Sequence, residues 1–198
     1  MATSDNLKIR SFIALPIPDP VRDVLRGTIK NLDEDIGKRV RWVRPEGIHL
    51  TLKFMGDIDL KVINELVSLL PAVANEFAPF ELTLAELGCF PNNRRPRVLW
   101  AGVKGNLSTL RDLHIAIDSL VGNVGLPREQ RGFSTHLTLG RVNRNLSENH
   151  TRHIGELIKT TNLPDNPSWI NPTINLMRTE LDPAGSRHYL VKSFPLLS

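Results

Sequence analysis

The same four residues, His-Leu-Thr-Leu, occur twice in this chain, at positions 49–52 and 136–139. Polar and apolar residues alternate in each copy, and in a β-strand residues i and i+2 share a face. His49 and Thr51 therefore point one way, as do His136 and Thr138, while the leucines point into a core. A fold that joins the two strands would gather two imidazoles and two hydroxyls, which suits general acid–base chemistry on a phosphate.

The two copies begin 87 residues apart (136 minus 49), which indicates one internal duplication rather than an array of short repeats. With 198 residues, the chain can form one large domain or two closely packed lobes. We expect a single domain over residues 1–198, of the α+β class, with two pseudo-symmetric lobes. Each lobe is predicted to be an antiparallel sheet backed by helices, and the lobes should meet at a central cleft.

The spacing of apolar residues predicts the elements of these lobes. Strands are expected at 9–17, 40–43, 48–55, 80–87, 98–103 and 133–142, with a final hairpin of 169–181 and 188–194 that turns at 182–185. Helices are expected at 20–36, ending at Gly37, at 60–77 with a possible kink at Pro71, at 107–121, and at 147–160 with Ser147 as N-cap. This alternation favours one compact unit.

Composition and charge narrow the class of protein. Hydrophobic residues make up 40% and charged residues 23%, which is ordinary for a globular domain. No apolar run is long enough to cross a bilayer, so no membrane partner is expected. Cys89 is the only cysteine and the N-terminus does not resemble a signal peptide, which together predict a cytoplasmic protein. We expect a monomer.

The net charge is +4, and the basic residues are unevenly distributed. Several flank the two repeats, and others gather in a mid-chain loop, which fits a phosphate-bearing ligand held by electrostatic attraction. Taken singly, each is better explained as surface charge. The clustered residues are Lys38, Arg39, Arg41, Arg44, Arg94, Arg95, Arg97, Arg128, Arg131, Arg141 and Arg144.

These features resemble the 2H phosphoesterase superfamily, and within it the RNA 2′,3′-cyclic phosphodiesterases, also called 2′-5′ RNA ligases. The similar stretches run nearly from end to end in the family's order: residues 10–16, 41–43, 49–56, 88–91, 96–100, 131–133, 136–141 and 189–196. The chain departs from the usual pattern at Thr135, where the family has proline, and at Gly140, where it has alanine. Neither change removes a chemical group.

The resemblance implies a function and a set of roles. The expected reaction is hydrolysis of an RNA 2′,3′-cyclic phosphate to a 2′-phosphomonoester, with His49 as proton donor and His136 as acceptor and with no cofactor. Thr51 and Thr138 are expected to bind the non-bridging oxygens. The resemblance also makes Arg131 a candidate for substrate contact and places the N- and C-terminal segments in one lobe. No P-loop is present, so any RNA joining should run as the ATP-independent reverse reaction.

Other readings stay open at this point. A different 2H substrate, such as a 2′-5′ oligonucleotide or a cyclic ADP-ribose phosphate, would need the same chemistry, and a non-catalytic RNA-binding protein would need only the basic cleft. A metal site is disfavoured because neither repeat has a cysteine or carboxylate at ligand spacing. Phe12 is either a core residue or a platform for a base, and we keep it as a candidate binding residue.

The remaining histidines, tryptophans and arginines receive simpler assignments. His114 and His188 are assigned to structure, and His150 and His153 to the surface of one helix. Trp42, Trp100 and Trp169 are interpreted as core residues. Arg141 follows His136 by five residues, so strand alternation places it on the opposite face unless a bulge intervenes.

Overall fold

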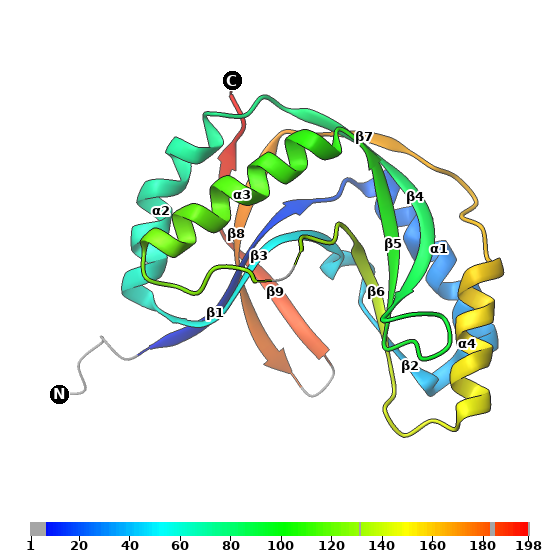
Figure 1. The fold of residues 1–198 in the computed structure, drawn as a ribbon. Helices are drawn as coiled ribbons and strands as arrows, with labels where there is room; N and C mark the ends of the chain where they lie inside the picture. Colours follow the sequence, from blue (N-terminus) through cyan, green and yellow to red (C-terminus); the bar gives the residue numbers. More distant parts are fainter. Residues whose placement is uncertain (1–6, 131, 183–184, 198) are drawn as a thin grey trace.

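The computed structural model describes residues 7–130, 132–182 and 185–197. Within these residues, nine strands form one sheet in the order β7-β4-β5-β6-β3-β1-β8-β9, with β2 paired to β6 (Figure 1). Every pairing is antiparallel. The strands are β1 (Lys8–Pro16), β2 (Val40–Trp42), β3 (His49–Asp59), β4 (Phe80–Phe90), β5 (Val98–Gly105), β6 (Leu137–Val142), β7 (Ser168–Asn171), β8 (Thr173–Asp182) and β9 (Gly185–Pro195).

The sheet consists of two halves that meet between β3 and β6. One half is β3, β1, β8 and β9, and the other is β6, β5, β4 and β7, so four strands of this path lie on each side of the junction. A single residue pair, Leu50 opposite Leu137, joins them. The α+β class is therefore confirmed, and the first and last strands of the chain do share one half. The two predicted sheets are continuous with one another.

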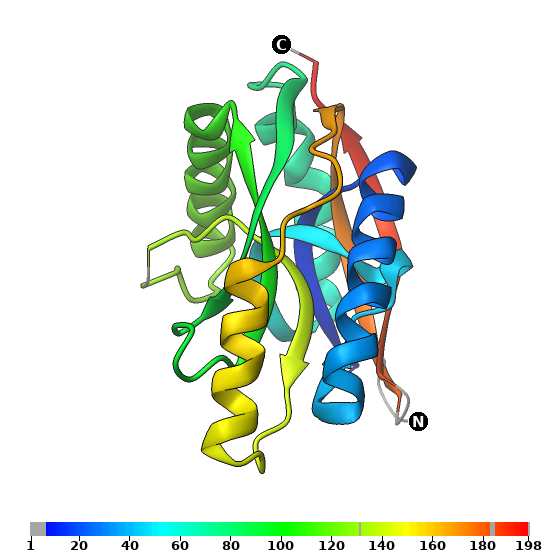
Figure 2. The same ribbon diagram turned by 90° about the vertical axis from the view of Figure 1, so that its right-hand side faces the viewer.

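The helices are α1 (Asp19–Ile36), α2 (Leu60–Ala74), α3 (Leu107–Asn123) and α4 (Glu148–Thr160), with short 3₁₀ turns η2 (Gly37–Arg39) and η3 (Pro45–Gly47). Helix α2 packs on α3 and on β3 and β9, whereas α4 packs on β4. Figures 1 and 2 show α2 and α3 together on one side of the sheet and α1 and α4 on the other. The four helices thus lie in two pairs, α2 with α3 and α1 with α4.

Helix α1 shows how sequence spacing produces this packing. Val21, Leu25, Ile29 and Leu32 lie on one face and are buried, as the helical period requires. The helix ends at Gly37, whose φ of 59° is readily adopted by glycine. Two apolar clusters fill the interior: a large one that includes residues of both halves, and a smaller one between α1, α4 and β4 to β6.

The structure departs from the predicted elements in five places, of which two are strand extensions: β3 continues to Asp59 instead of residue 55, and β4 to Phe90 instead of residue 87. The strand expected from residue 133 begins at Leu137, because residues before it do not pair with a neighbouring strand. The strand expected at 169–181 divides at Pro172, which has no N–H to donate; β7 then pairs with β4, and β8 with β1. Helix α2 ends at Ala74, with Pro71 inside its last turn.

The other expectations agree well with the structure. The final hairpin forms, with β8 paired to β9, although residues 183 and 184 of its turn lie outside the described residues. Ser147 is the N-cap of α4, and its hydroxyl accepts a hydrogen bond from the backbone N–H of His150. In the part of the chain that is described, no helix combines the length and the apolar character needed to cross a membrane.

Candidate active site

The two repeats meet at the junction of the two halves. Leu50 and Leu137 are directly opposite each other and fully buried. Continuing the antiparallel register places His49 across from Thr138 and Thr51 across from His136, all on the face opposite the leucines. Each histidine is thus next to the threonine of the other repeat. This is the four-residue arrangement that the sequence pattern predicts.

Both histidines are oriented by the same local hydrogen bond. Nδ1 of His49 lies 2.8 Å from the carbonyl oxygen of Gly47, and Nδ1 of His136 lies 2.8 Å from that of Ser134. A carbonyl can only accept, so Nδ1 carries the proton in each ring and donates it. Nε2 is then the nitrogen of each neutral imidazole that can exchange a proton with a ligand.

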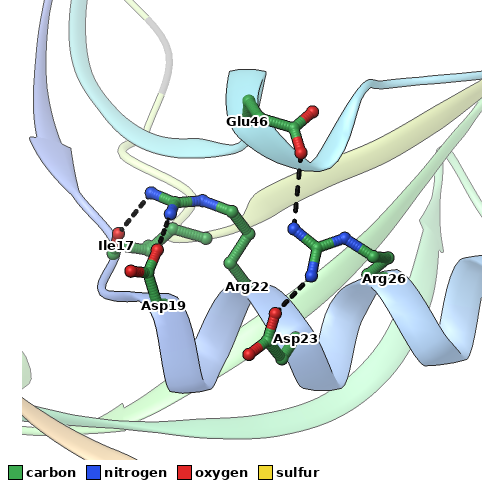
Figure 3. Close-up of polar contacts among 6 residues, drawn as sticks. All are labelled: Ile17, Asp19, Arg22, Asp23, Arg26 and Glu46. Carbon is green, nitrogen blue, oxygen red and sulfur yellow. Dashed lines mark hydrogen bonds and ion pairs between the residues drawn. The ribbon is translucent and has the colours of Figure 1, made fainter.

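The turn that holds His49 is itself tied to helix α1. Arg26 of α1 donates a hydrogen bond to Glu46, with 3.3 Å between Nη2 and Oε1, and it also pairs with Asp23 on its own helix (Figure 3). Glu46 precedes Gly47 in the 3₁₀ turn η3. The carbonyl that orients His49 therefore belongs to a turn that the Arg26–Glu46 hydrogen bond connects to α1.

The segment before His136 is held by a buried ion pair. Lys53 of β3, only 4% exposed, donates to Asp118 of α3 at 2.6 Å and to the carbonyl oxygen of Pro127 at 2.9 Å. The backbone N–H of Glu129 donates to the same carboxylate oxygen at 2.9 Å. The first repeat thus anchors, through Lys53, the segment that leads into the second.

A ring stack tethers the same segment further along. Phe133 stacks on His114 of α3, with 4.1 Å between centroids and 8° between planes. His114 is buried, and its Nδ1 lies 2.9 Å from the carbonyl oxygen of Leu52. The assignment of His114 to structure agrees with these contacts. Its role is to connect α3 and β3 with the segment before His136.

The two histidines differ in their surroundings. The ring of Phe12 stacks on His49 at 4.5 Å, and that of His188 meets it edge-on at 5.1 Å. His136 has a single ring neighbour among the described residues, Phe90, at 5.0 Å. Burial, reinforced by the like charges of His188 and His136, lowers the pKa of His49 to about 4. Burial, and then the charge of Arg141, also lowers the pKa of His136.

A cavity of about 500 Å³ opens in front of His49, and His136 is not among the residues that line it. His49, Thr51 and Thr138 line it together with four arginines, and no carboxylate is among the described residues that line it. Its positive surface suits an anionic ligand, and its size is typical of small-molecule sites. The arginines are Arg10, Arg41, Arg44 and Arg141.

Arg141 faces the cavity because β6 contains a bulge. Trp100 pairs with Thr138 and Leu99 with Gly140, so Leu139 is an extra residue on β6. The bulge reverses the alternation beyond it, which brings Arg141 to the same side as Thr138. The sequence argument allowed for this only if a bulge intervened, and it does. Arg131 lies outside the described residues, so its expected substrate contact remains a prediction.

The sequence left two roles open for Phe12, and its burial favours the core. Phe12 is 2% exposed and its ring is stacked on His49, so little of it can meet a base. Phe54, which sequence reasoning did not single out, is 51% exposed in the cavity wall, with Arg10 4.8 Å from its ring centre. Its position five residues after His49, matching Arg141 after His136, is the signal that could have identified it.

The packing in the cavity wall explains why glycine stands at position 140, where the family pattern has alanine. A Cβ on Gly140 would lie 2.6 Å from Cγ1 of Val40 and 2.8 Å from Cε3 of Trp42, closer than atoms can pack. Glycine therefore lets β2 lie close against β6. Trp42, interpreted from the sequence as a core residue, is half-buried in the cavity wall, and its Nε1 donates to Asp33 at 2.7 Å.

Within the described residues, no three His, Cys, Asp or Glu side chains gather in a group that could hold a metal ion. Metal-independent catalysis remains a prediction. The arrangement as it stands offers two imidazoles with Nδ1 engaged, two hydroxyls and a cationic wall. Such a set can transfer protons on both sides of a bound phosphorus and stabilise negative charge on its oxygens.

Comparison with known proteins gives consistent matches. The family described as "LigT like Phosphoesterase" matches residues 15–100. A protein of Methanothermobacter thermautotrophicus named RNA 2′,3′-cyclic phosphodiesterase is 32% identical over 182 residues, which cover 90% of this chain and 94% of that protein. A Bacillus subtilis protein of the same name is 34% identical over 130 residues, which cover 66% of this chain and 69% of that protein.

Solved structures share the fold. A crystal structure of a Thermus thermophilus protein superimposes with a TM-score of 0.78 at 24% identity, covering 95% of this chain and 98% of that one. The Escherichia coli LigT protein in complex with 3′-AMP superimposes with a TM-score of 0.73 at 21% identity, covering 96% of this chain and 99% of that one.

Proposed function

This chain belongs to the LigT-like phosphoesterase family, and on that premise we propose that it hydrolyses RNA 2′,3′-cyclic phosphate ends to 2′-phosphomonoesters. The observation that carries the proposal is the antiparallel pairing of Leu50 with Leu137, whose register sets each histidine beside the threonine of the other repeat. Curated relatives named for this activity, similar over most of the chain, support the choice of substrate.

The reaction requires two proton transfers on opposite sides of one phosphorus. A water that loses its proton to one imidazole attacks the phosphorus, and the 3′-oxygen leaves as it takes the Nε2 proton of the other ring, which enters the step as an imidazolium and ends it as a neutral imidazole. The bond between phosphorus and the 3′-oxygen breaks, and the phosphate stays on the 2′-oxygen. The symmetric placement of His49 and His136 supports these two roles.

The threonines and arginines act on the charge that develops. Thr51 and Thr138 donate hydrogen bonds to the non-bridging oxygens, because their hydroxyls share the face of the histidines. Arg41 and Arg141 are directly opposite each other on β2 and β6, and both line the cavity. They attract the anionic substrate and favour its binding over that of a neutral ligand.

The order of the two histidines follows from the family resemblance, with His49 as donor and His136 as acceptor. In the unliganded cleft the pKa of His49 is about 4, so this imidazole is neutral at pH 7. A bound phosphodiester anion favours the charged form and raises the pKa. His49 would thus take up its proton as substrate binds. The near symmetry of the site leaves the reverse order open.

We also propose that the protein acts as a monomer in the cytoplasm. Its only cysteine, Cys89, is buried and free, as suits a reducing compartment.

The test is an assay of the purified protein with 2′,3′-cyclic nucleotides and with RNA carrying a 2′,3′-cyclic phosphate end. We expect a 2′-phosphomonoester from both, in the presence of EDTA. A 2′-5′-linked oligonucleotide and a cyclic ADP-ribose phosphate serve as comparison substrates. Preferred cleavage of either would assign another 2H activity, whereas RNA binding without turnover would assign a non-catalytic role. Formation of 2′-5′ joined RNA without ATP would add the reverse reaction.

A further inference from the structure

His188 of β9 lies beside His49, although the sequence assigns it only to structure. It is half-buried and lines the cavity together with its cross-strand partner Thr179 of β8. Nδ1 of His188 lies 3.0 Å from the hydroxyl oxygen of Thr179, which sets the orientation of its ring. The two residues approach the site from the last hairpin, far along the chain from either repeat.

Three rings contact one another at this point. The ring centroid of His188 lies 5.1 Å from that of His49, with 87° between planes, and 5.1 Å from that of Phe12, with 83°. Phe12 in turn stacks on His49 at 4.5 Å. The imidazole of His49 is therefore packed between a stacked ring and an edge-on ring, both favourable aromatic geometries.

His188 also lies against the turn that orients His49. A Cβ placed on Gly47 would be 3.6 Å from Cδ2 of His188, an ordinary packing distance. The carbonyl of Gly47 is the group that accepts the hydrogen bond from Nδ1 of His49. His188 thus lies beside both the ring of His49 and the turn that holds it.

We propose that His188 is a positioning residue for His49, whose ring, with that of Phe12, confines the His49 imidazole to the orientation in which Nδ1 donates to Gly47 and Nε2 serves the reaction. The role in turnover rests on the proposed function, whereas the effect on the His49 ring does not. Confinement matters because a misplacement of about 1 Å in a catalytic group can cost on the order of 10²-fold in rate.

The charges around the two rings determine how His188 acts on His49 electrostatically. A protonated His188 disfavours protonation of His49, as does His136, which immediately precedes β6, and burial lowers the pKa of His188 itself. The charged groups that line the same cavity come from β1, from β2 and the segment after it, and from β6, and all are cationic: Arg10, Arg41, Arg44 and Arg141. Replacing His188 therefore removes a positive neighbour without exposing a carboxylate.

The first test is steady-state kinetics on a 2′,3′-cyclic nucleotide with His188→Ala and His188→Phe. We expect His188→Ala to lower kcat about 10-fold with little change in KM, because Phe12 and Gly47 still hold part of the His49 ring. His188→Phe keeps an aromatic edge and should recover most of that loss. His153→Ala, which removes an exposed histidine of α4, is the matched control and should behave as wild type.

Several outcomes of this test would overturn the proposal. Unchanged kcat in His188→Ala means that the ring does not position His49. A rise in KM alone means that His188 contacts substrate instead. Equal losses in the Ala and Phe variants mean that its nitrogen atoms, not its ring, are what matters. Thr179→Val, which frees the ring without deleting it, should give a smaller loss than His188→Ala, and thermal unfolding checks that each variant folds.

The second test follows the His49 ring by NMR titration and needs no turnover. Burial by the His188 ring and the charge of His188 both lower the pKa of His49. His188→Ala removes both effects and His188→Phe removes only the charge, so the titration midpoint of His49 should move upward in both variants and further in His188→Ala. If the wild type hydrolyses no cyclic phosphate but the midpoint still moves, the proposed function fails and the positioning role stands. If the midpoint does not move in either variant, the positioning role fails whatever the activity.

Discussion

The two repeats of the chain have the same backbone and different surroundings. In both, the histidine donates from Nδ1 to the carbonyl two residues earlier at 2.8 Å. In both, the second leucine, Leu52 or Leu139, is an extra bulged residue opposite the neighbouring strand. The burial pattern along the six residues from each histidine is the same. The duplication therefore extends from the four matching residues to the strand distortion that follows them.

The two repeats diverge immediately after this shared geometry. The fourth residue after the histidine is Lys53 in one and Gly140 in the other, and the fifth is Phe54 in one and Arg141 in the other. His49 is more deeply enclosed, and the pKa of His49 falls to about 4. One backbone therefore stands in two environments, and two chemically identical side chains have different neighbours. The following predictions test this comparison, beginning with the largest effect.

Replacing either histidine should abolish most of the turnover. We expect His49→Ala and His136→Ala each to lower kcat by about 10²–10⁴-fold, because each removes one of two necessary proton transfers. Turnover of a 2′,3′-cyclic nucleotide measures the loss, and circular dichroism confirms that the variants fold. Near-normal turnover in one of them would show that only the other histidine is catalytic, and the two repeats would then not share a catalytic role.

Replacing Lys53 should destabilise the protein, whereas the second repeat has no equivalent ion pair to lose. Lys53→Met leaves the carboxylate of Asp118 without its lysine, and we expect a loss of about 3 kcal/mol in unfolding free energy. Urea unfolding measures it. Lys61→Met, an exposed lysine of α2, is the control and should change stability by less than about 0.5 kcal/mol.

A double variant separates the ion pair from the rest of the Lys53 side chain. Adding Asp118→Leu to Lys53→Met removes the unpaired carboxylate, so the double variant should be more stable than Lys53→Met alone. A double variant less stable than either single variant would show that Asp118 acts chiefly through the backbone of Glu129, not through Lys53.

Lowering the pH should destabilise the protein because His49 is buried in its neutral form. Its pKa is about 4 when folded and near 6.5 when unfolded. Between these values the unfolded chain binds more protons, so the stability is fully present above pH 6.5 and is lost as pH falls toward 4. The loss from this group is roughly 3 kcal/mol. Urea unfolding at pH 7 and pH 4 should show a smaller loss in His49→Phe than in wild type; equal losses would contradict the buried neutral state.

The smallest expected effects are those of the threonines. A hydrogen bond to a charged group contributes about 1.5–3 kcal/mol, so Thr51→Val and Thr138→Val should each lower kcat/KM by roughly 10–100-fold. Valine keeps the β-branched shape, and serine, which keeps the hydroxyl, should lose less. If Val and Ser variants are equally impaired, packing and not hydrogen bonding explains the threonines. Unequal losses at the two positions would show that the phosphate is bound asymmetrically.

Much of the fold could be predicted because helix and strand periods are local. The stop of α1 at Gly37, the cap at Ser147 and the closing hairpin each depend on residues within a few positions of one another. Pairing partners are not local. That β7 pairs with β4 while β8 pairs with β1, and that β6 starts late, depends on which distant strand lies alongside, and neither could be inferred from alternation alone.

The sequence by itself determined which groups could form the candidate site, two histidines and two threonines with each pair on one face, since alternation along an extended backbone follows from its geometry. Only the tertiary structure decided what surrounds them. The side of the strand that Arg141 occupies depends on a bulge in β6 opposite β5. The contact of His188 with His49 depends on the sheet order, in which β1 and β8 connect β9 to β3. Burial and neighbouring charge, which lower the pKa of both His49 and His136, arise from contacts between residues distant in the chain.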